Sequence, residues 1–280
     1  MIENTILVIG GTGKTGRRVA DRLTAAGVPV RVGSRSGSPR FDWHDRATWA
    51  PAFAGVRAAY VTFYPDLAVP GSPALIAELA RAAASAGVEH LVLLSGRGEE
   101  EAQASERALA DAVAGTGTAW SVVRASWFMQ NFSEAFMADG VREGTLVLPA
   151  GDVPEPFVDC DDIADVAVAA LTGAIPPGQV HEVTGPRALT FAEAVQEIAK
   201  AAGREVTFVP VPLDAYAAEL RGFGLPDDEI ELITYLFGEV LDGRNVAVAP
   251  GVRAALGREP RDFADYARTA AAGGAWAPPA

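Results

Sequence analysis

The most specific chemistry in this chain is suggested by a glycine-rich segment, VIGGTGKTGRR, which spans Val8 to Arg18. Its run Gly13 to Thr15 resembles the end of a P-loop, which wraps the phosphates of a nucleoside triphosphate. A P-loop needs a further glycine five residues before the one that precedes its lysine, and that position is Val8. Val8 lies inside the apolar run Ile6 to Ile9, which predicts a buried parallel strand. A wrapping loop cannot begin inside a strand, so the P-loop interpretation is excluded.

The glycine spacing instead favours a dinucleotide-binding turn. Gly11, Gly13 and Gly16 fit the G-x-G-x-x-G pattern, and Gly10 opens a second spacing that also fits. A predicted strand precedes the turn and an amphipathic helix follows it, as this kind of site requires. The alternative is a glycine-rich turn that binds nothing. The residues expected to hold the dinucleotide phosphates on backbone N–H groups are Gly10, Gly11, Thr12, Gly13, Lys14, Thr15 and Gly16.

The end of the next predicted strand bears on which dinucleotide is bound. An NAD site usually has Asp or Glu there, but no carboxylate occurs between Arg31 and Ser38. Ser34 and Arg35 occupy that place, and a hydroxyl with a guanidinium suits a 2′-phosphate, so NADP(H) is preferred over NAD(H). Arg35 could instead be a solvated loop cation. Asp42 and Trp43, after a further short strand, are expected near the adenine, although Trp43 could equally belong to the core.

The tyrosine–lysine pair that many carbonyl reductases of this kind use is missing. Lys14 and Lys200 are the only lysines, and no tyrosine has a lysine four residues later. Any proton that the reaction needs could come from solvent, from Ser95 or from Tyr64, and catalysis is expected to come mainly from orientation and exclusion of water.

Other catalytic or metal-binding patterns are not convincing. The three histidines have no metal-ligand spacing, and no metal is expected. Asp159, Asp161, Asp162 and Asp165 could suggest a cation site, but their place at a predicted helix start favours helix capping and the helix dipole. The acidic run Glu99 to Glu101 is interpreted in the same way.

Short apolar strands alternate with helices over the first half of the chain. This alternation predicts a Rossmann-type, doubly wound parallel α/β sheet. We expect an NAD(P)-binding domain over residues 1–150 and a smaller α+β substrate lobe over 151–280, with discontinuous lobes as an option. The expected strands are Val28 to Gly33, Ala58 to Phe63, Leu91 to Ser95 and Trp120 to Arg124, with isolated strands at Val180 to Thr184 and Val206 to Pro210.

The amino-acid composition limits the kinds of molecule that this protein is expected to bind. A net charge of −13 argues against a nucleic-acid partner, because phosphate contacts need clustered Lys and Arg. No apolar run is long enough to span a bilayer, and the single cysteine, Cys160, fits a reducing cytoplasm. We therefore expect a cytoplasmic protein that acts on a small-molecule substrate, as a monomer or a homodimer.

Several segments together resemble the NmrA-like branch of the atypical short-chain dehydrogenases, which includes triphenylmethane reductase and quinone reductases. The segments that carry the resemblance are LVIGGTGKTGRRVA, HLVLLSG, WSVVRASWFMQNF, EPFVDCDDIADVAVAAL, HEVTGP, LTFAEAVQEIA and ALGREPRDFADYA. The resemblance implies nicotinamide contacts at strand ends, which here carry Thr62, Phe63, Ser95 and Gly96. It also implies a substrate pocket, for which the candidates are Tyr64, Trp127, Phe128, Asn131 and Phe132. Any one of these aromatic residues could instead pack in the core of the lobe.

The resemblance leaves two functions open. The first is an NADPH-dependent reductase that transfers hydride to an aromatic or conjugated electrophile, such as a quinone, an enone or an iminium ion. The second is a non-catalytic sensor of NADP(H) that docks onto a protein partner, because the branch includes such regulators.

Overall fold

The computed structural model describes residues 4–277, which divide into two compact units. Unit 1 comprises the described residues up to Ala125, together with Cys160–Val183 and Pro250–Arg258. Unit 2 comprises Ser126–Asp159, Thr184–Ala249 and the described residues from Glu259 onward. The boundary expected near residue 150 does not coincide with this division, because the chain enters and leaves each unit more than once.

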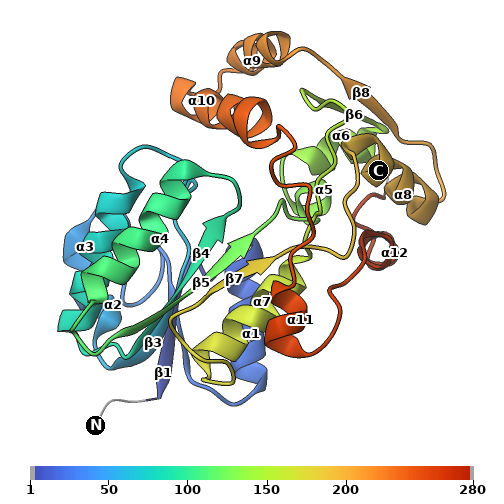
Figure 1. Ribbon diagram of the computed structural model, residues 1–280. Coiled ribbons are helices and arrows are strands. Elements are labelled where there is room, and N and C mark those ends of the chain that lie inside the picture. The colour runs from blue at the N-terminus through green and yellow to red at the C-terminus, as the bar shows by residue number, and fades with distance from the viewer. Residues whose placement is uncertain (1–3, 278–280) are drawn as a thin grey trace. The chain divides into compact units, whose positions relative to one another are not determined.

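Unit 1 is built on a six-stranded sheet in which each pair of neighbouring strands is parallel (Figure 1). The strand order is β2-β1-β3-β4-β5-β7. The order reverses between β1 and β3, which is the doubly wound Rossmann arrangement, so the predicted fold class is confirmed. The strands are β1 (Thr5–Ile9), β2 (Val30–Gly33), β3 (Val56–Val61), β4 (His90–Gly96), β5 (Ala119–Ala125) and β7 (Val180–Val183).

Helices cover both faces of this sheet, as the continuous apolar strands require. One face carries α1 (Lys14–Ala25), α7 (Cys160–Leu171) and α11 (Gly251–Leu256). The other carries α2 (Trp49–Phe53), α3 (Ser72–Ser85) and α4 (Glu100–Val113), with the short turn η1 (Arg46–Thr48) before α2. None of the helices within residues 4–277 has both the length and the apolar character needed to cross a membrane.

Three details of the expected strand pattern were wrong. The strand expected to be isolated at Val206 to Pro210 is β8 (Thr207–Pro210), which pairs in parallel with β6 (Thr145–Leu148). The other strand expected to be isolated, Val180 to Thr184, is β7, which pairs with β5 and extends the main sheet. Without β7 the far side of β5 would be an unpaired sheet edge. The short strand expected before Asp42 does not form: residues 34–41 are a loop, closed by a hydrogen bond from the N–H of Phe41 to the carbonyl oxygen of Ser34 at 2.9 Å.

Unit 2 has a small parallel sheet of two strands, β6 (Thr145–Leu148) and β8 (Thr207–Pro210). Its core is aromatic, with Phe132, Phe157 and Phe191 completely or almost completely buried. Their ring centroids lie 5.1–5.9 Å apart. The other elements of unit 2 are α5 (Asn131–Glu134), α6 (Met137–Glu143), α8 (Phe191–Ala202), α9 (Leu213–Gly222), α10 (Asp227–Tyr235), η2 (Leu236–Val240) and α12 (Phe263–Ala272).

Candidate functional site

The glycine-rich segment forms the turn between β1 and α1. β1 continues through Val8 to Ile9, so the position that a P-loop needs for glycine is strand. α1 begins directly after Gly13, whose extended backbone caps the helix without a side chain. The first N–H groups of a helix have no partner inside it, and they carry the positive end of the helix dipole. This turn therefore has the arrangement that binds a phosphate group.

Three glycines of the turn differ in what surrounds the position of a side chain. A Cβ on Gly16 would lie 2.2 Å from the carbonyl oxygen of Gly10, so only glycine lets the helix pack this closely on the turn. Gly10 has a φ of +72°, and its missing side chain leaves room for the Thr62 hydroxyl, which would lie 2.0 Å from a Cβ. A Cβ on Gly13 would meet the Gly10 carbonyl oxygen at 3.3 Å and no other atom within 4 Å. Gly13 is exposed, which leaves its surroundings open to a ligand.

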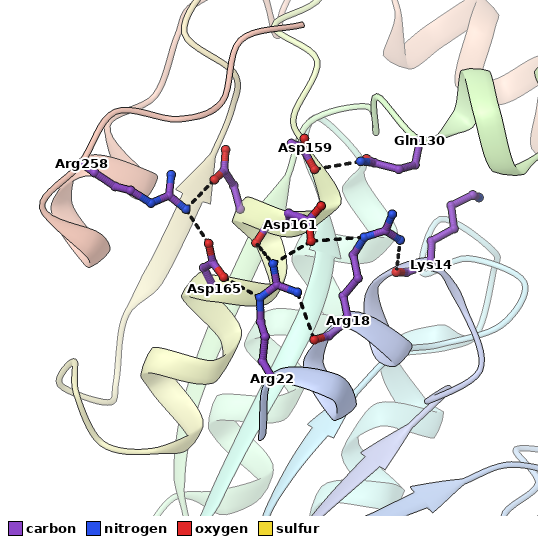
Figure 2. Close-up of polar contacts among 9 residues, drawn as sticks. Lys14, Arg18, Arg22, Gln130, Asp159, Asp161, Asp165 and Arg258 are labelled. Atoms are coloured by element: carbon purple, nitrogen blue, oxygen red, sulfur yellow. Dashed lines mark hydrogen bonds and ion pairs between the residues drawn. The ribbon is translucent and has the colours of Figure 1, made fainter. Parts of the chain in front are cut away.

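The residues predicted to choose between NADP(H) and NAD(H) lie at the end of β2. Ser34 is half-buried directly after the strand, and Arg35 is exposed. Lys14 is the first residue of α1 and is half-buried. Figure 2 shows its backbone carbonyl accepting a hydrogen bond from Arg18, while its side chain extends away from that contact. Ser34 and Arg35 remain the residues predicted to bind a 2′-phosphate.

The residues predicted near the adenine differ in their surroundings. Trp43 is buried, its ring packs against Phe41, Trp49 and Phe63, and its indole N–H donates to the carbonyl oxygen of Thr62 at 3.1 Å. Trp43 therefore belongs to the core of unit 1, which is the alternative left open for it. Asp42 accepts a hydrogen bond from the N–H of His44, and this bond and Arg40 lower the pKa of its carboxyl.

The carboxyl end of β3 carries two other predicted residues in different environments. The hydroxyl of Thr62 donates to the carbonyl oxygen of Ile9 at 3.0 Å, which ties β3 to the glycine turn. Tyr64 is 65% exposed and follows two residues later. Its hydroxyl is therefore open to solvent, whereas Thr62 is part of the structure that holds the turn.

Ser95, near the end of β4, takes part in a buried polar network that the sequence does not reveal. Its hydroxyl donates to the Glu106 carboxylate at 2.6 Å. Arg124 on β5 binds the same carboxylate through two nitrogens, at 2.5 and 2.9 Å. Glu182 on β7 joins Arg124 to Arg97, at 3.3 and 2.6 Å respectively. Since Glu106 already accepts the proton of the Ser95 hydroxyl, Ser95 is better placed to fix the end of β4 than to protonate a substrate.

Glu99 does not have the role predicted for it. It occupies the residue before α4, but its side chain makes no capping hydrogen bond. Instead the carboxyl folds back over Gly96, where a Cβ on that glycine would lie 2.1 Å from it. Burial and the nearby charges of Asp66 and Glu106 raise the pKa of Glu99 well above its usual range. Burial likewise raises the pKa of Asp66. An acidic run at a helix start is so typical of capping that the sequence offered no signal for this arrangement.

The carboxylates at the start of α7 are bound by arginines. Arg22 on α1 contacts Asp161 and Asp165 at 2.6 and 2.5 Å (Figure 2). Arg258, at the end of α11, contacts Asp162 and Asp165 at 2.7 and 2.5 Å. Among residues 4–277 no group of three or more His, Cys, Asp or Glu side chains is arranged to hold a metal ion. Asp161 and Asp162 also lie in the first turn of α7, where negative charge is favoured.

Four of the five predicted substrate residues, all but Tyr64, lie in unit 2 directly after β5 in the chain. Phe132 is completely buried and packs on Phe157, so it is a core residue. Trp127 is half-buried, and its ring contacts Phe191 and Phe237 edge-on at 5.6 and 4.9 Å. Phe128 and Asn131 are also half-buried, so these two and Trp127 keep some exposed surface.

Neighbouring polar contacts hold this segment in place within unit 2. The side-chain amide of Gln130 donates to Asp159 at 2.8 Å, and the hydroxyl of Ser126 donates to Glu155. Both carboxylates are buried, and the main chain of Phe128 pairs with that of Val158. The segment is therefore fixed by the strand-like stretch that contains Glu155 to Asp159, a partner that sequence spacing did not indicate.

Comparison with known proteins agrees with the fold and shows the family. The sequence profile of the NmrA-like family matches residues 40–267. Agroclavine dehydrogenase of Claviceps fusiformis is 34% identical over 94% of this chain and 96% of its own. NAD(P)H azoreductase of Xenophilus azovorans is 32% identical over 95% of this chain and 98% of its own. The NADPH-dependent quinone oxidoreductase QOR2 of Escherichia coli, solved with NADPH, has a TM-score of 0.77 at 21% identity, covering 94% of this chain and 99% of that one. The chain belongs to the NmrA-like family.

Proposed function

We propose that this protein is an NADPH-dependent reductase that transfers hydride to a small aromatic or conjugated electrophile without a tyrosine–lysine pair. The enzyme class follows from its relatives, which include a dehydrogenase and a reductase that match it over more than nine-tenths of its length. Beyond this enzyme class, we propose a preference for NADPH and an aromatic or conjugated acceptor.

The observation that carries the proposal is the cradle formed by the glycine turn. Gly13 leaves no side chain at the start of α1, where a phosphate would bind, while Gly10 and Gly16 let Thr62 and the helix pack closely on the turn. The fit of this turn to a dinucleotide pyrophosphate is therefore good. The absence of a carboxylate after β2, with Ser34 and Arg35 in its place, supports NADPH, since a carboxylate would repel a 2′-phosphate.

A nicotinamide coenzyme bound there would supply a hydride, and the protein would supply position and a dry environment. In the doubly wound fold, ligands bind outside the carboxyl ends of the strands. Thr62 and Phe63 follow the end of β3, Ser95 and Gly96 lie at the end of β4, and the network of Ser95, Glu106 and Arg124 holds the end of β4 in place. A preorganised site of this kind lowers the barrier through orientation rather than through a dedicated acid.

The acceptor class is supported by two features. A quinone, an iminium ion or a carbocation accepts hydride readily, so the lack of a tyrosine–lysine pair is no obstacle. The azoreductase relative, by its name, reduces azo compounds with NAD(P)H. Trp127, Phe128 and Asn131, which keep some exposed surface, are our candidates for contact with a flat acceptor.

The test is a spectrophotometric assay of NADPH and NADH oxidation against quinones, triarylmethane dyes, enones and imines. We expect turnover with NADPH and much less with NADH. Arg35→Ala should raise the KM for NADPH about tenfold, the loss of one charged hydrogen bond to phosphate, and leave that for NADH unchanged. A preference for NADH would contradict the 2′-phosphate site. Tight NADPH binding without turnover of any acceptor would favour the non-catalytic sensor.

A further inference from the structure

Two carboxyl groups lie at the carboxyl ends of neighbouring strands, outside the residues discussed as cofactor ligands. Asp66 follows β3 by five residues and Glu99 follows β4 by three. β3 and β4 are paired in parallel, so both loops leave the same edge of the sheet. The two carboxyls are close enough that each affects the pKa of the other. This is the edge at which ligands bind in doubly wound folds.

The Glu99 side chain is placed unusually for a carboxylate. It is only 8% exposed, it does not cap its own helix, and its carboxyl lies against the backbone of Gly96. Within the described part of the chain its Oε2 has no hydrogen-bond partner. A buried ionised carboxylate without a partner is costly, whereas a protonated one is far less so. The Oε2 without a partner therefore indicates either that this carboxyl carries a proton or that a ligand group forms a hydrogen bond with it.

The charged groups around Glu99 favour the proton. Asp66 faces it from the loop after β3, and Glu106 faces it from α4, so both neighbours are acidic. Arg124 binds Glu106, and Arg97 binds Glu182. Two carboxyls in contact cannot both ionise easily, and they share one proton. Asp66 is partly exposed, so the pair reaches from the interior to solvent.

We propose that Asp66 and Glu99 hold one proton between them at neutral pH and deliver it to the acceptor during reduction. This inference rests on the proposed reductase function. A quinone that is reduced to a hydroquinone gains a hydride and one further proton, while the nicotinamide is oxidised. The carboxyl pair gives up that proton from Asp66, the partly exposed member of the pair, and takes one back from solvent. A cationic triarylmethane dye becomes neutral on gaining hydride alone and needs no proton.

This difference between acceptors provides the test. Glu99→Gln should lower kcat with a quinone at pH 7.5 at least tenfold, within the range typical of a lost general acid. The same variant should reduce a cationic triarylmethane dye within about twofold of the wild-type rate, since that reaction involves no proton transfer to which an acid could contribute. Asp66→Asn should show the same selectivity. Glu100→Gln changes the exposed carboxylate that follows Glu99 in the chain, and this variant should change neither rate. Equal loss with both acceptors, or no loss with either, would overturn proton delivery.

A second measurement does not depend on turnover. The infrared carbonyl stretch of a protonated carboxyl should be present at pH 7 in the wild-type protein, be lost in Glu99→Gln and persist in Glu100→Gln. Its absence from the wild-type spectrum would overturn the inference that the pair holds a proton. If the wild-type protein reduces neither acceptor, the proposed function fails, proton delivery fails with it, and the infrared band alone decides whether the pair is protonated.

Discussion

Single glycines decide whether a phosphate can approach the start of α1. Gly16 is buried and meets the backbone of Gly10, whereas Gly13 is exposed and its backbone has a φ of −81° that alanine adopts freely. The two residues therefore serve different purposes. Gly16 allows the helix to pack on the turn, and Gly13 leaves space for the ligand.

Alanine at these two positions should separate folding from cofactor binding. Gly16→Ala should lower the free energy of unfolding by about 2 kcal/mol, because backbone atoms cannot move aside, and should abolish NADPH binding. Gly13→Ala should keep the wild-type urea midpoint and weaken NADPH binding about tenfold or more, because its Cβ projects toward the phosphate. Urea denaturation and NADPH fluorescence titration measure the two effects. Wild-type affinity in Gly13→Ala would contradict the role of the turn.

At the scale of elements, α7 joins unit 1 through charge as well as through apolar packing. Its apolar side contains Ile163, Val166 and Ala167, all completely buried. Its acidic first turns are bound by Arg22 of α1 and Arg258 near the end of α11. These ion pairs connect segments separated by up to 143 residues in the chain. They hold α7 in register with α1, the helix whose N-terminus forms the proposed phosphate site.

Removing one of these arginines should therefore cost more than removing an exposed one. Arg22→Ala should lower the free energy of unfolding by roughly 1–2 kcal/mol, because the ion pairs are partly buried and two carboxylates each lose one of their arginine partners. Arg221→Ala is the matched control, since the Arg221–Asp227 pair is largely exposed. It should change stability by less than about 0.5 kcal/mol. Equal urea midpoints for the two variants would show that the ion pairs of α7 contribute nothing measurable.

The pH dependence of stability belongs to the whole molecule, because it sums all the titrating groups of the chain. Burial lowers the pKa of His90 and His181, so each stays neutral in the folded protein below the pH at which it charges in the unfolded chain. The unfolded state then binds more protons, and stability falls as the pH falls through about 6.5. Glu99 acts in the opposite sense. Its raised pKa gives stability that is present at low pH and is lost as the pH rises.

The histidine contribution can be isolated by substitution. His181 is 7% exposed, and within the described chain its Nε2 has no hydrogen-bond partner. His181→Leu should therefore reduce the fall in the free energy of unfolding between pH 7.5 and 5.5, by up to about 1.4 kcal/mol per pH unit, as measured by urea denaturation. His44→Gln, at an exposed position, should keep the wild-type slope. The net charge of −13 affects all these variants almost alike, so a slope in His181→Leu equal to the wild type would contradict the assignment.

Local sequence was enough to predict the features that depend on neighbours in the chain. The glycine turn, the strand before it and the helix after it lie within about two dozen residues, and their spacing carries the physical reason for them. Alternating apolar strands and helices were likewise enough for the doubly wound sheet, because strand–helix–strand connections have one hand. What that pattern could not assign was β7, since a short apolar strand looks the same whether it extends a large sheet or stands alone.

Tertiary structure decided the chemistry of the carboxylates. Asp161 and Asp165 lie in the first two turns of α7 and Glu99 directly precedes α4, places where capping and the helix dipole are the usual explanation. Arg22, more than a hundred residues away in the chain, binds the first two, whereas burial beside Asp66 sets the state of the third. The direction of a side chain and the charge that faces it depend on which strands become neighbours, and no spacing along the chain records that.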